Sequence, residues 1–359
     1  MKFDHNNISP LDNRYLSKIS DIRNIFSEHG LIKTRFIIEI NWLLFLCEKY
    51  PRYFTKINST TIKKVIKFRD SFNDQSVLEI KKIEKTTNHD VKAVEYYIRN
   101  FFNKDKGLSK YNHLIHFGLT SEDINSLAYA ILLKDGLKIY LNNIKLLNAN
   151  LKKLSKKWIN IPLLSRTHGQ AASPSTIGKE LKVFTTRIDR EIKKISDITP
   201  LAKFSGAVGN YHALDVAVSN IDWIKLTKRF IKNFNIEQNR ITTQIEPHDW
   251  IAEMLQIITR INNISIDLSQ DLWIYISNEI FKLKLNTNEI GSSTMPHKVN
   301  PIDFENAEGN FGLSNALNDF FINKLTKSRL QRDLSDSTVL RNIGMSFGYS
   351  KIALASLEN

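Results

Sequence analysis

Apolar residues along most of this chain recur every three or four positions, the spacing that places them on one face of an α-helix. The longest such stretch runs from Ser121 to about Trp158 and contains no proline and a single glycine, Gly136. Its apolar positions include Leu137, Leu141, Ile144, Leu147, Leu151 and Leu154. Because Thr120 or Ser121 can cap the start, the pattern predicts a helix of about 38 residues, roughly 57 Å long.

Further helices are predicted on both sides of this segment. Their expected ranges are Leu31–Glu48, Val91–Phe102, Ser175–Ile198, Pro247–Leu283, a helix after Asn300-Pro301, and one from Ser335 that still runs at Asn359. The helix after Pro247 is apolar on more than one side, which is typical of a buried central helix. These elements predict an all-α fold, with a long-helix bundle over residues 110–359 and a smaller N-terminal helical domain over residues 1–109.

Composition narrows the class of protein. Hydrophobic residues make up 42% of the 359 residues, which is enough for a globular core. No run of about 18 apolar residues predicts a membrane span, and the polar N-terminus lacks the apolar stretch of a signal peptide. Cys47 is the only cysteine, so neither an intrachain disulfide nor a thiolate metal cluster is expected. The sequence predicts a soluble cytoplasmic protein.

The net charge of +14 raises the possibility of nucleic-acid binding. However, the basic residues are scattered, as at Lys63-Lys64, and form no recognised nucleic-acid-binding motif. A small polyanionic substrate needs only a local cationic pocket, and diffuse positive charge would help it to arrive. Nucleic-acid binding therefore stays a minor alternative.

The segment from Gly291 to Pro301 carries the densest candidate chemistry. It reads Gly-Ser-Ser-Thr-Met-Pro-His-Lys-Val-Asn-Pro, so hydroxyls, an imidazole and an ammonium group precede the N-terminus of a predicted helix. Such a loop can stabilise an oxyanion or a carboxylate. On residue types alone, a loop with a helix-capping Asn300 remains the alternative interpretation.

Other polar stretches precede predicted helices. Ser165 to Gln170 contains His168, and a lone histidine is more often structural than catalytic. Asn88 and Asp90 are good capping residues, and the hydroxyls of Thr120 and Ser121 lie beside unpaired helix N–H groups, where a phosphate or carboxylate can bind. Each stretch has an ordinary structural explanation when it is considered by itself.

Taken together, these stretches resemble one known family. The loop at 291–301 is similar to the pattern Gly-Ser-Ser-x-Met-Pro-x-Lys-x-Asn-Pro of the fumarase/aspartase superfamily, and His297 with the following Ile-Asp-Phe-Glu-Asn resembles the adenylosuccinate lyase family. The stretches Arg-Thr-His-Gly-Gln, Thr-Asn-His-Asp-Val-Lys-Ala-Val-Glu and Thr-Ser-Glu-Asp-Ile also resemble that family, as do the segments that contain Asn13, Gln244 and Arg332. Ala171 departs from the proline that is common there. The matches extend from about residue 9 to residue 345, in the family's order.

The resemblance implies a β-elimination that releases fumarate from adenylosuccinate, giving AMP, and from the succinyl-carboxamide ribotide of purine biosynthesis. Ser292 is implied as the base and His168 as the acid. The loop from Gly291 to Asn300, which contains Ser292, is expected to be mobile when empty and ordered with substrate bound. The positions that match the family's substrate contacts are Arg14, Tyr15, Asn88, His89, Asp90, Thr120, Ser121, Gln244, Lys298, Asn300, Arg332, Ser337 and Arg341. The guanidinium groups of Arg332 and Arg341 suit a phosphate.

The resemblance also implies a homotetramer whose active sites are each built from three chains, with no metal, no cofactor and no membrane partner. Members of the family continue beyond the position that corresponds to Asn359, so their small C-terminal helical domain is expected to be absent here. Two alternatives within the superfamily stay open: another fumarate-releasing lyase, and a non-catalytic member built on the same scaffold.

Overall fold

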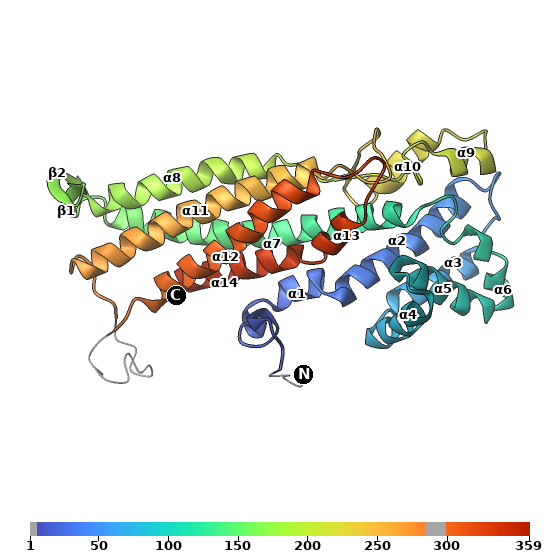
Figure 1. Cartoon of the computed structure of the whole chain (residues 1–359), viewed down its shortest axis with the longest axis horizontal. Helices are drawn as coiled ribbons and strands as arrows, with labels where there is room; N and C mark the ends of the chain where they lie inside the picture. The colour runs from blue at the N-terminus through green and yellow to red at the C-terminus, as the bar shows by residue number, and fades with distance from the viewer. Residues whose placement is uncertain (1–5, 285–298) are drawn as a thin grey trace.

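The computed structural model describes residues 6–284 and 299–359, so Ser292 and Lys298 lie outside the described part of the chain. Long helices that run side by side dominate the molecule (Figure 1). They are α7 (Ser121–Lys157), α8 (Ile177–Ser196), α11 (Asp249–Ser277), α12 (Ile302–Leu325) and α14 (Ile343–Glu358). The predicted all-α, long-helix bundle is therefore confirmed.

The N-terminal part consists of shorter helices that pack at one end and along one side of the bundle. They are η1 (Pro10–Asp12), η2 (Leu16–Lys18), α1 (Ser20–Phe26), α2 (Glu28–Lys49), α3 (Ser59–Asp70), α4 (Asp74–Thr87), α5 (Asp90–Asn103), α6 (Lys106–Ser109) and η3 (Asn112–Leu114). The other elements are β1 (Pro162–Thr167), β2 (Gln170–Thr176), β3 (Leu201–Ala202), α9 (His212–Ala217), α10 (Trp223–Lys232), β4 (Glu237–Gln238) and α13 (Ser335–Leu340).

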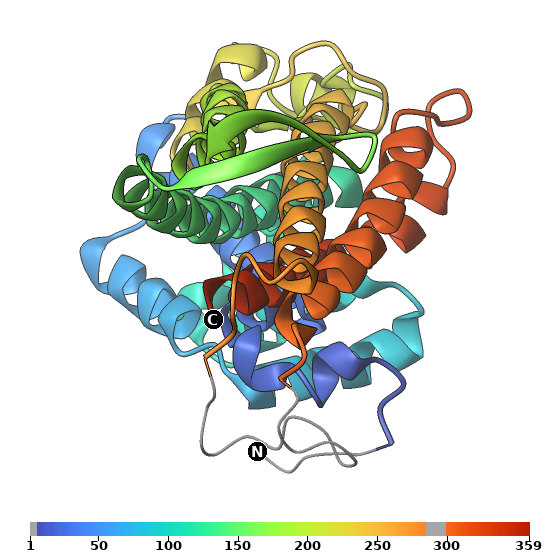
Figure 2. The same cartoon turned by 90° about the vertical axis from the view of Figure 1, so that its left-hand side faces the viewer.

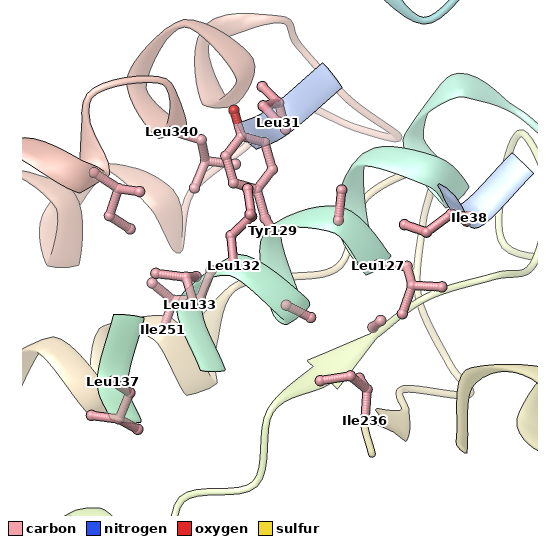
Figure 3. Packing of buried hydrophobic residues seen from close by; sticks show 14 of the residues in the cluster. Leu31, Ile38, Leu127, Tyr129, Leu132, Leu133, Leu137, Ile236, Ile251 and Leu340 are labelled. Atoms are coloured by element: carbon pink, nitrogen blue, oxygen red, sulfur yellow. The ribbon is translucent and has the colours of Figure 1, made fainter. Parts of the chain in front are cut away.

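Helix α7 is the central element of the core. A capping box fixes its start, because the Thr120 side chain accepts from the backbone at Asp123 while the Asp123 side chain accepts from the Thr120 N–H. Its apolar side chains pack against residues from α2, α11 and α13 (Figure 3). The buried apolar residues form one continuous cluster that includes both N-terminal and bundle helices. The division at residue 109 stays a prediction.

The predicted helix from Ser335 to Asn359 is wrong as one element, because two helices meet there. Helix α13 ends at Leu340 and α14 begins at Ile343. The Asn342 side chain donates to the Thr338 carbonyl and so caps the end of α13. Asparagine competes for backbone hydrogen bonds in this way and favours helix ends over helix interiors.

Helix α11 is shorter than predicted and stops at Ser277, six residues before Leu283. Glu279 adopts a left-handed conformation with φ of 57°, and the Ile280 N–H donates back to the Tyr275 carbonyl at 2.9 Å. This is the hydrogen-bond pattern that commonly ends a helix. None of the described helices is both long and apolar enough to cross a membrane.

The stretch from Ser165 to Gln170, which we expected to be a polar loop, belongs to an antiparallel hairpin of β1 and β2. Ser175, the predicted start of the next helix, lies in β2, and α8 begins at Ile177. Thr167 pairs with Gln170, so His168 and Gly169 form a two-residue turn, with φ of 54° and 73°. Positive φ at both central residues defines a type I′ turn, whose twist matches that of the strands. The hairpin lies across the end of the bundle at which α7 finishes (Figure 2).

Candidate active site

The loop between α12 and α13 brings three of the expected substrate-binding residues together. The guanidinium of Arg332 donates to Gln244 Oε1 at 3.4 Å and to Ser337 Oγ at 3.2 Å. It also pairs with Glu122 Oε2 at 3.1 Å, on the first turn of α7. The Arg332 side chain is 13% exposed, so its edge is still open to a ligand.

Behind Arg332 lies a group of buried ionisable side chains. Asp336 Oδ1 is 3.6 Å from Arg332 Nε, and Asp336 Oδ2 is 3.9 Å from His248 Nε2. His248 Nδ1 lies 3.4 Å from Glu246 Oε2, which also accepts from the His248 backbone N–H at 2.7 Å. We call Glu122, Glu246, His248, Arg332 and Asp336 the Arg332 cluster.

Burial and mutual charge shift the pKa values of this cluster. Burial raises the pKa of Glu122 to about 7, although Arg332 opposes the shift. For His248, burial lowers the pKa, but Asp336 and Glu246 outweigh that effect and raise it to about 9. Burial works to raise the pKa of Asp336, whereas His248 and Arg332 hold it below its usual value. His248 is therefore a cation at neutral pH, and Glu122 is the group that titrates there.

A fully buried ion pair anchors the start of α7 next to the cluster. Lys203 Nζ lies 2.7 Å from Asp123 Oδ1, and both side chains are 0% exposed. Asp123 also accepts from the backbone N–H groups of Ser205 and Gly206 at 2.8 and 3.2 Å. Because a buried pair needs such additional hydrogen bonds, these contacts hold the end of α7 against the loop after β3.

A second group surrounds Asp90 at the start of α5. Asp90 Oδ2 pairs with Arg35 at 2.9 Å and with Arg341 at 2.6 Å. Arg341 also pairs with Glu28 at 3.2 Å. Burial works to raise the pKa of Asp90, but Arg35 and the other partners lower it to about 2. Two expected binding residues, Asp90 and Arg341, therefore contact each other directly.

A third group lines a cavity of about 570 Å³ between α5 and the start of α7. The residues at its wall include His89, Lys92, Tyr96, His116, Thr120 and Ser121. His89 caps α5 through its Nδ1, and its Nε2 lies 3.5 Å from Ser121 Oγ. Asn88 joins α4 to α5 in a left-handed conformation. His116 is held by the buried Glu39, with Nδ1 and Oε1 2.6 Å apart.

His168 lies far from these groups within one chain. It is exposed at the tip of the hairpin that follows α7, whereas Ser121 is the first residue of α7 (Figure 1). The 37 residues of α7 span about 55 Å. Asn300 precedes α12 at the hairpin end, where Glu305 accepts from Trp273 near the end of α11 at 3.1 Å.

Arg14 and Tyr15 occupy a separate place next to η1, where the Arg14 guanidinium lies 5.8 Å from the Tyr15 ring centre. The described candidate residues therefore fall into separate regions of one chain. Nine lie around the start of α7, α5 and α13: Asn88, His89, Asp90, Thr120, Ser121, Gln244, Arg332, Ser337 and Arg341. His168, Asn300, Arg14 and Tyr15 lie elsewhere.

Sequence reasoning missed four members of the Arg332 cluster as site residues: Glu122, Glu246, His248 and Asp336. Each belongs to a stretch that resembles the family, so its position was noticed but not its role. By its position alone, Glu122 is a first-turn acid that favours the helix dipole, yet it is only 2% exposed. Among residues 6–284 and 299–359, no group of three or more histidine, cysteine or acidic side chains could hold a metal ion.

Comparison with known proteins defines the class. A family model described as Lyase matches residues 14–312. The solved structure of a fumarate lyase from Mesorhizobium sp. BNC1 superposes with a TM-score of 0.77 at 16% identity, covering 94% of this chain and 74% of that one. The 3-carboxy-cis,cis-muconate lactonizing enzyme from Pseudomonas putida gives 0.73 at 17% identity, covering 96% and 76%. The chain has the fold of the fumarase/aspartase lyases.

Relatives of higher sequence identity show which family within this class the chain belongs to. A model described as Adenylosuccinate lyase C-terminal matches residues 328–359. The adenylosuccinate lyase of Legionella pneumophila (strain Corby) is 48% identical over 98% of this chain and 78% of its own length. Those of Buchnera aphidicola subsp. Schizaphis graminum and Escherichia coli (strain K12) are 49% and 46% identical, over 98% and 97% of this chain and 77% of each relative. The chain belongs to the adenylosuccinate lyase family.

Proposed function

We propose that this chain is a C–N lyase that releases fumarate from adenylosuccinate, giving AMP, and from the succinyl-carboxamide ribotide. The observation that carries the proposal is near-complete coverage by adenylosuccinate lyases at 46 to 49% identity. Arg332 supports it, because a partly exposed guanidinium beside Gln244 and Ser337 suits a phosphate.

The reaction needs two proton transfers. A base removes a weakly acidic proton from the carbon beside a carboxylate, and an acid protonates the departing nitrogen. We assign the base to Ser292 and the acid to His168. Lys298 and Asn300 are assigned to the substrate carboxylate, whose negative charge grows as the proton leaves.

These roles are tested by two substitutions, His168→Ala and Ser292→Ala. Each is expected to lower turnover by at least about a hundredfold, the scale of losing one acid or base. Near-normal turnover in either variant would remove that residue from its role.

The separation of His168 from the other groups supports a shared site. Because about 55 Å of α7 lies between them, we propose that another copy of the chain brings its hairpin to the Arg332 cluster, in a homotetramer. Four large apolar side chains on α11 and α12 are 42 to 53% exposed and suit such an interface: Trp273, Ile274, Leu313 and Phe320. A stable monomer in light scattering would contradict the tetramer.

The activity itself is tested by following fumarate and AMP by ultraviolet absorbance after adenylosuccinate is added. Measurement of fumarate hydration in parallel distinguishes another superfamily lyase. Absence of fumarate release from an intact oligomer would favour a non-catalytic member. We also propose a cytoplasmic location, without a nucleic-acid or membrane partner.

A further inference from the structure

The contact between Glu122 and Arg332 is unusual, because an arginine suited to a substrate phosphate is already paired with a buried carboxylate. Glu122 Oε2 lies 3.1 Å from the guanidinium and also accepts from Asn125 Nδ2 at 3.4 Å. Apart from Asp336, whose Oδ1 lies 3.6 Å from Arg332 Nε, the other close partners of Arg332 are the neutral Gln244 and Ser337. The negative charge of Glu122 would therefore repel a dianionic phosphate that binds Arg332.

Ionisable groups face Glu122 from each element that packs around it. Asp336 comes from α13, and His248 and Glu246 from the segment before α11. Lys203 comes from the loop after β3, and Asp123 and Tyr129 from α7 itself. Tyr129 is neutral near pH 7, because burial raises its pKa to about 12.

The charges in this region do not balance when every carboxyl group is ionised. Lys203 and Asp123 neutralise each other at 2.7 Å. Within the Arg332 cluster, two cations then face three carboxylates, so one negative charge is left over in a buried space. Because an uncompensated buried charge is costly, one proton shared by the cluster removes the excess.

We propose that Glu122 is a positioning residue that holds Arg332 through an ion pair in the empty site and takes up a proton when an anionic substrate group binds that arginine. The inference rests on the proposed function, since it assigns a nucleotide phosphate to Arg332. On binding, a proton from solvent joins the Glu122 carboxylate, and the ion pair becomes a hydrogen bond between the guanidinium cation and a neutral carboxyl group. The phosphate takes over as the counter-ion, and no covalent bond changes.

Protonation of Glu122 links the affinity for an anionic ligand to pH. The pKa of Glu122 is about 7 in the free protein, and a bound anion raises it further. A ligand that raises a pKa binds more tightly where the proton is present, so affinity falls as pH rises above 7. Ionisation of the phosphate itself, near pH 6, is common to all variants and cancels in a comparison.

The first test measures AMP binding to the full chain by calorimetry at pH 7, in two buffers with different ionisation enthalpies. We expect wild-type protein to take up as much as about half a proton per site, because Glu122 is half ionised there. The isosteric variant Glu122→Gln is expected to lose that uptake. Equal proton uptake in the two proteins, or none in wild type that binds AMP, would overturn the proposal.

The second test compares affinities between pH 6 and pH 8.5. We expect AMP to bind Glu122→Gln about as tightly as wild type at pH 6, and about tenfold more tightly at pH 8.5, where wild-type Glu122 competes for Arg332. The KM for adenylosuccinate should follow the same pattern, while kcat changes little. Damage to the fold would weaken binding at both pH values, and that result would contradict the positioning role.

A matched control is available on α8. Glu191 Oε2 lies 2.9 Å from Arg260 Nε, so Glu191→Gln removes a more exposed carboxylate–arginine pair outside the Arg332 cluster. It is expected to keep the wild-type proton uptake and pH profile. If wild type releases no fumarate and binds no AMP, the proposed function fails. If wild type is active but Glu122→Gln keeps its pH profile, only the present inference fails.

Discussion

At the residue scale, His248 shows how neighbouring carboxylates keep a buried imidazole cationic at neutral pH. It precedes α11 in a left-handed conformation, with φ of 65°, and its side chain is 4% exposed. Asp336 and Glu246 lie against its two ring nitrogens, which raises its pKa to about 9. The protonated ring is therefore part of the folded structure at neutral pH.

This pKa predicts how stability depends on pH. A histidine titrates near 6.5 when unfolded, so its stabilisation is complete below 6.5 and disappears as pH rises through 9. The thermal midpoint of the wild type should fall between pH 6.5 and 9.5, by an amount equivalent to about 2 to 3 kcal/mol. His248→Gln should have a lower midpoint that changes less with pH. Circular dichroism melts at four pH values would measure this, and an equal slope in both proteins would contradict it.

The contributions of Glu122 and His248 to the pH dependence can be separated in the same melts. Glu122 has a raised pKa of about 7, so it changes the pH dependence of stability between pH 4.5 and pH 7. The change in the thermal midpoint above pH 7.5 is therefore due mainly to His248.

Some residues of the candidate site could be identified from the sequence, and others could not. Gln244, Arg332 and Ser337 were chosen from the sequence and do contact one another. Glu122 was misjudged because helical spacing identifies a first turn but not what packs against it. The role of His248 depends on Asp336, which is distant in sequence, and one chain's sequence does not show that the two meet.

At the element scale, close contacts between helices depend on single glycines. A Cβ atom added to Gly136 of α7 would lie 2.5 Å from the ring of Phe26, and one added to Gly344 of α14 would lie 2.3 Å from Phe26 Cβ. The Phe26 ring also stacks on Phe347 at 5.1 Å. Phe26, at the end of α1, therefore fills a gap that these two glycines leave.

This packing predicts that Gly136→Ala destabilises the protein. Alanine favours a helix by up to about 1 kcal/mol over glycine, but the clash with Phe26 should cost about 1 to 3 kcal/mol and outweigh it. Thermal or urea unfolding would measure the difference. Gly136→Ala should cost less stability when it is introduced into Phe26→Leu than when it is introduced into wild type. Purely additive effects of the two substitutions would argue against the clash.

The hairpin carries a different prediction. Gly169 has φ of 73° and nothing within 4 Å of an added Cβ, so Gly169→Ala strains only the backbone, by about 1 to 2 kcal/mol. We expect turnover to fall several-fold through displacement of His168, while the thermal midpoint falls by only a few degrees. Gly169→Asn is the control, because asparagine tolerates this conformation, and it should retain more activity. Equal activity in both variants would show that the turn geometry does not matter.

Sequence periodicity predicted the long helices well and the hairpin not at all. The predicted Ser121 to Trp158 became α7, Ser121–Lys157, because apolar spacing and the capping box agree. Strands β1 and β2 are mostly exposed, so they lack the apolar alternation that marks a half-buried strand. Their turn is His-Gly rather than the usual Asn-Gly or Asp-Gly.

At the scale of the whole molecule, the described parts of the proposed site cannot meet within one chain. His168 and the Arg332 cluster are separated by the length of α7 (Figure 1). This separation predicts complementation between inactive variants. Equal mixing and reassembly of His168→Ala and Arg332→Ala chains should recover roughly a quarter of wild-type activity, because a symmetric oligomer then contains sites that draw an intact residue from each parent. Recovery of no activity from a mixed oligomer would contradict the shared site.

A chain with inactivating changes at both ends of α7 should lower the activity of the normal chains with which it assembles. In the proposed shared-site oligomer each copy of α7 contributes to two pockets, so such a copy would disable one pocket with its hairpin and another with its opposite end. In a population of normal and defective chains that assemble at random, the surviving pockets would scale with the square of the intact fraction. Lesions of this kind are therefore expected to behave as dominant-negative alleles.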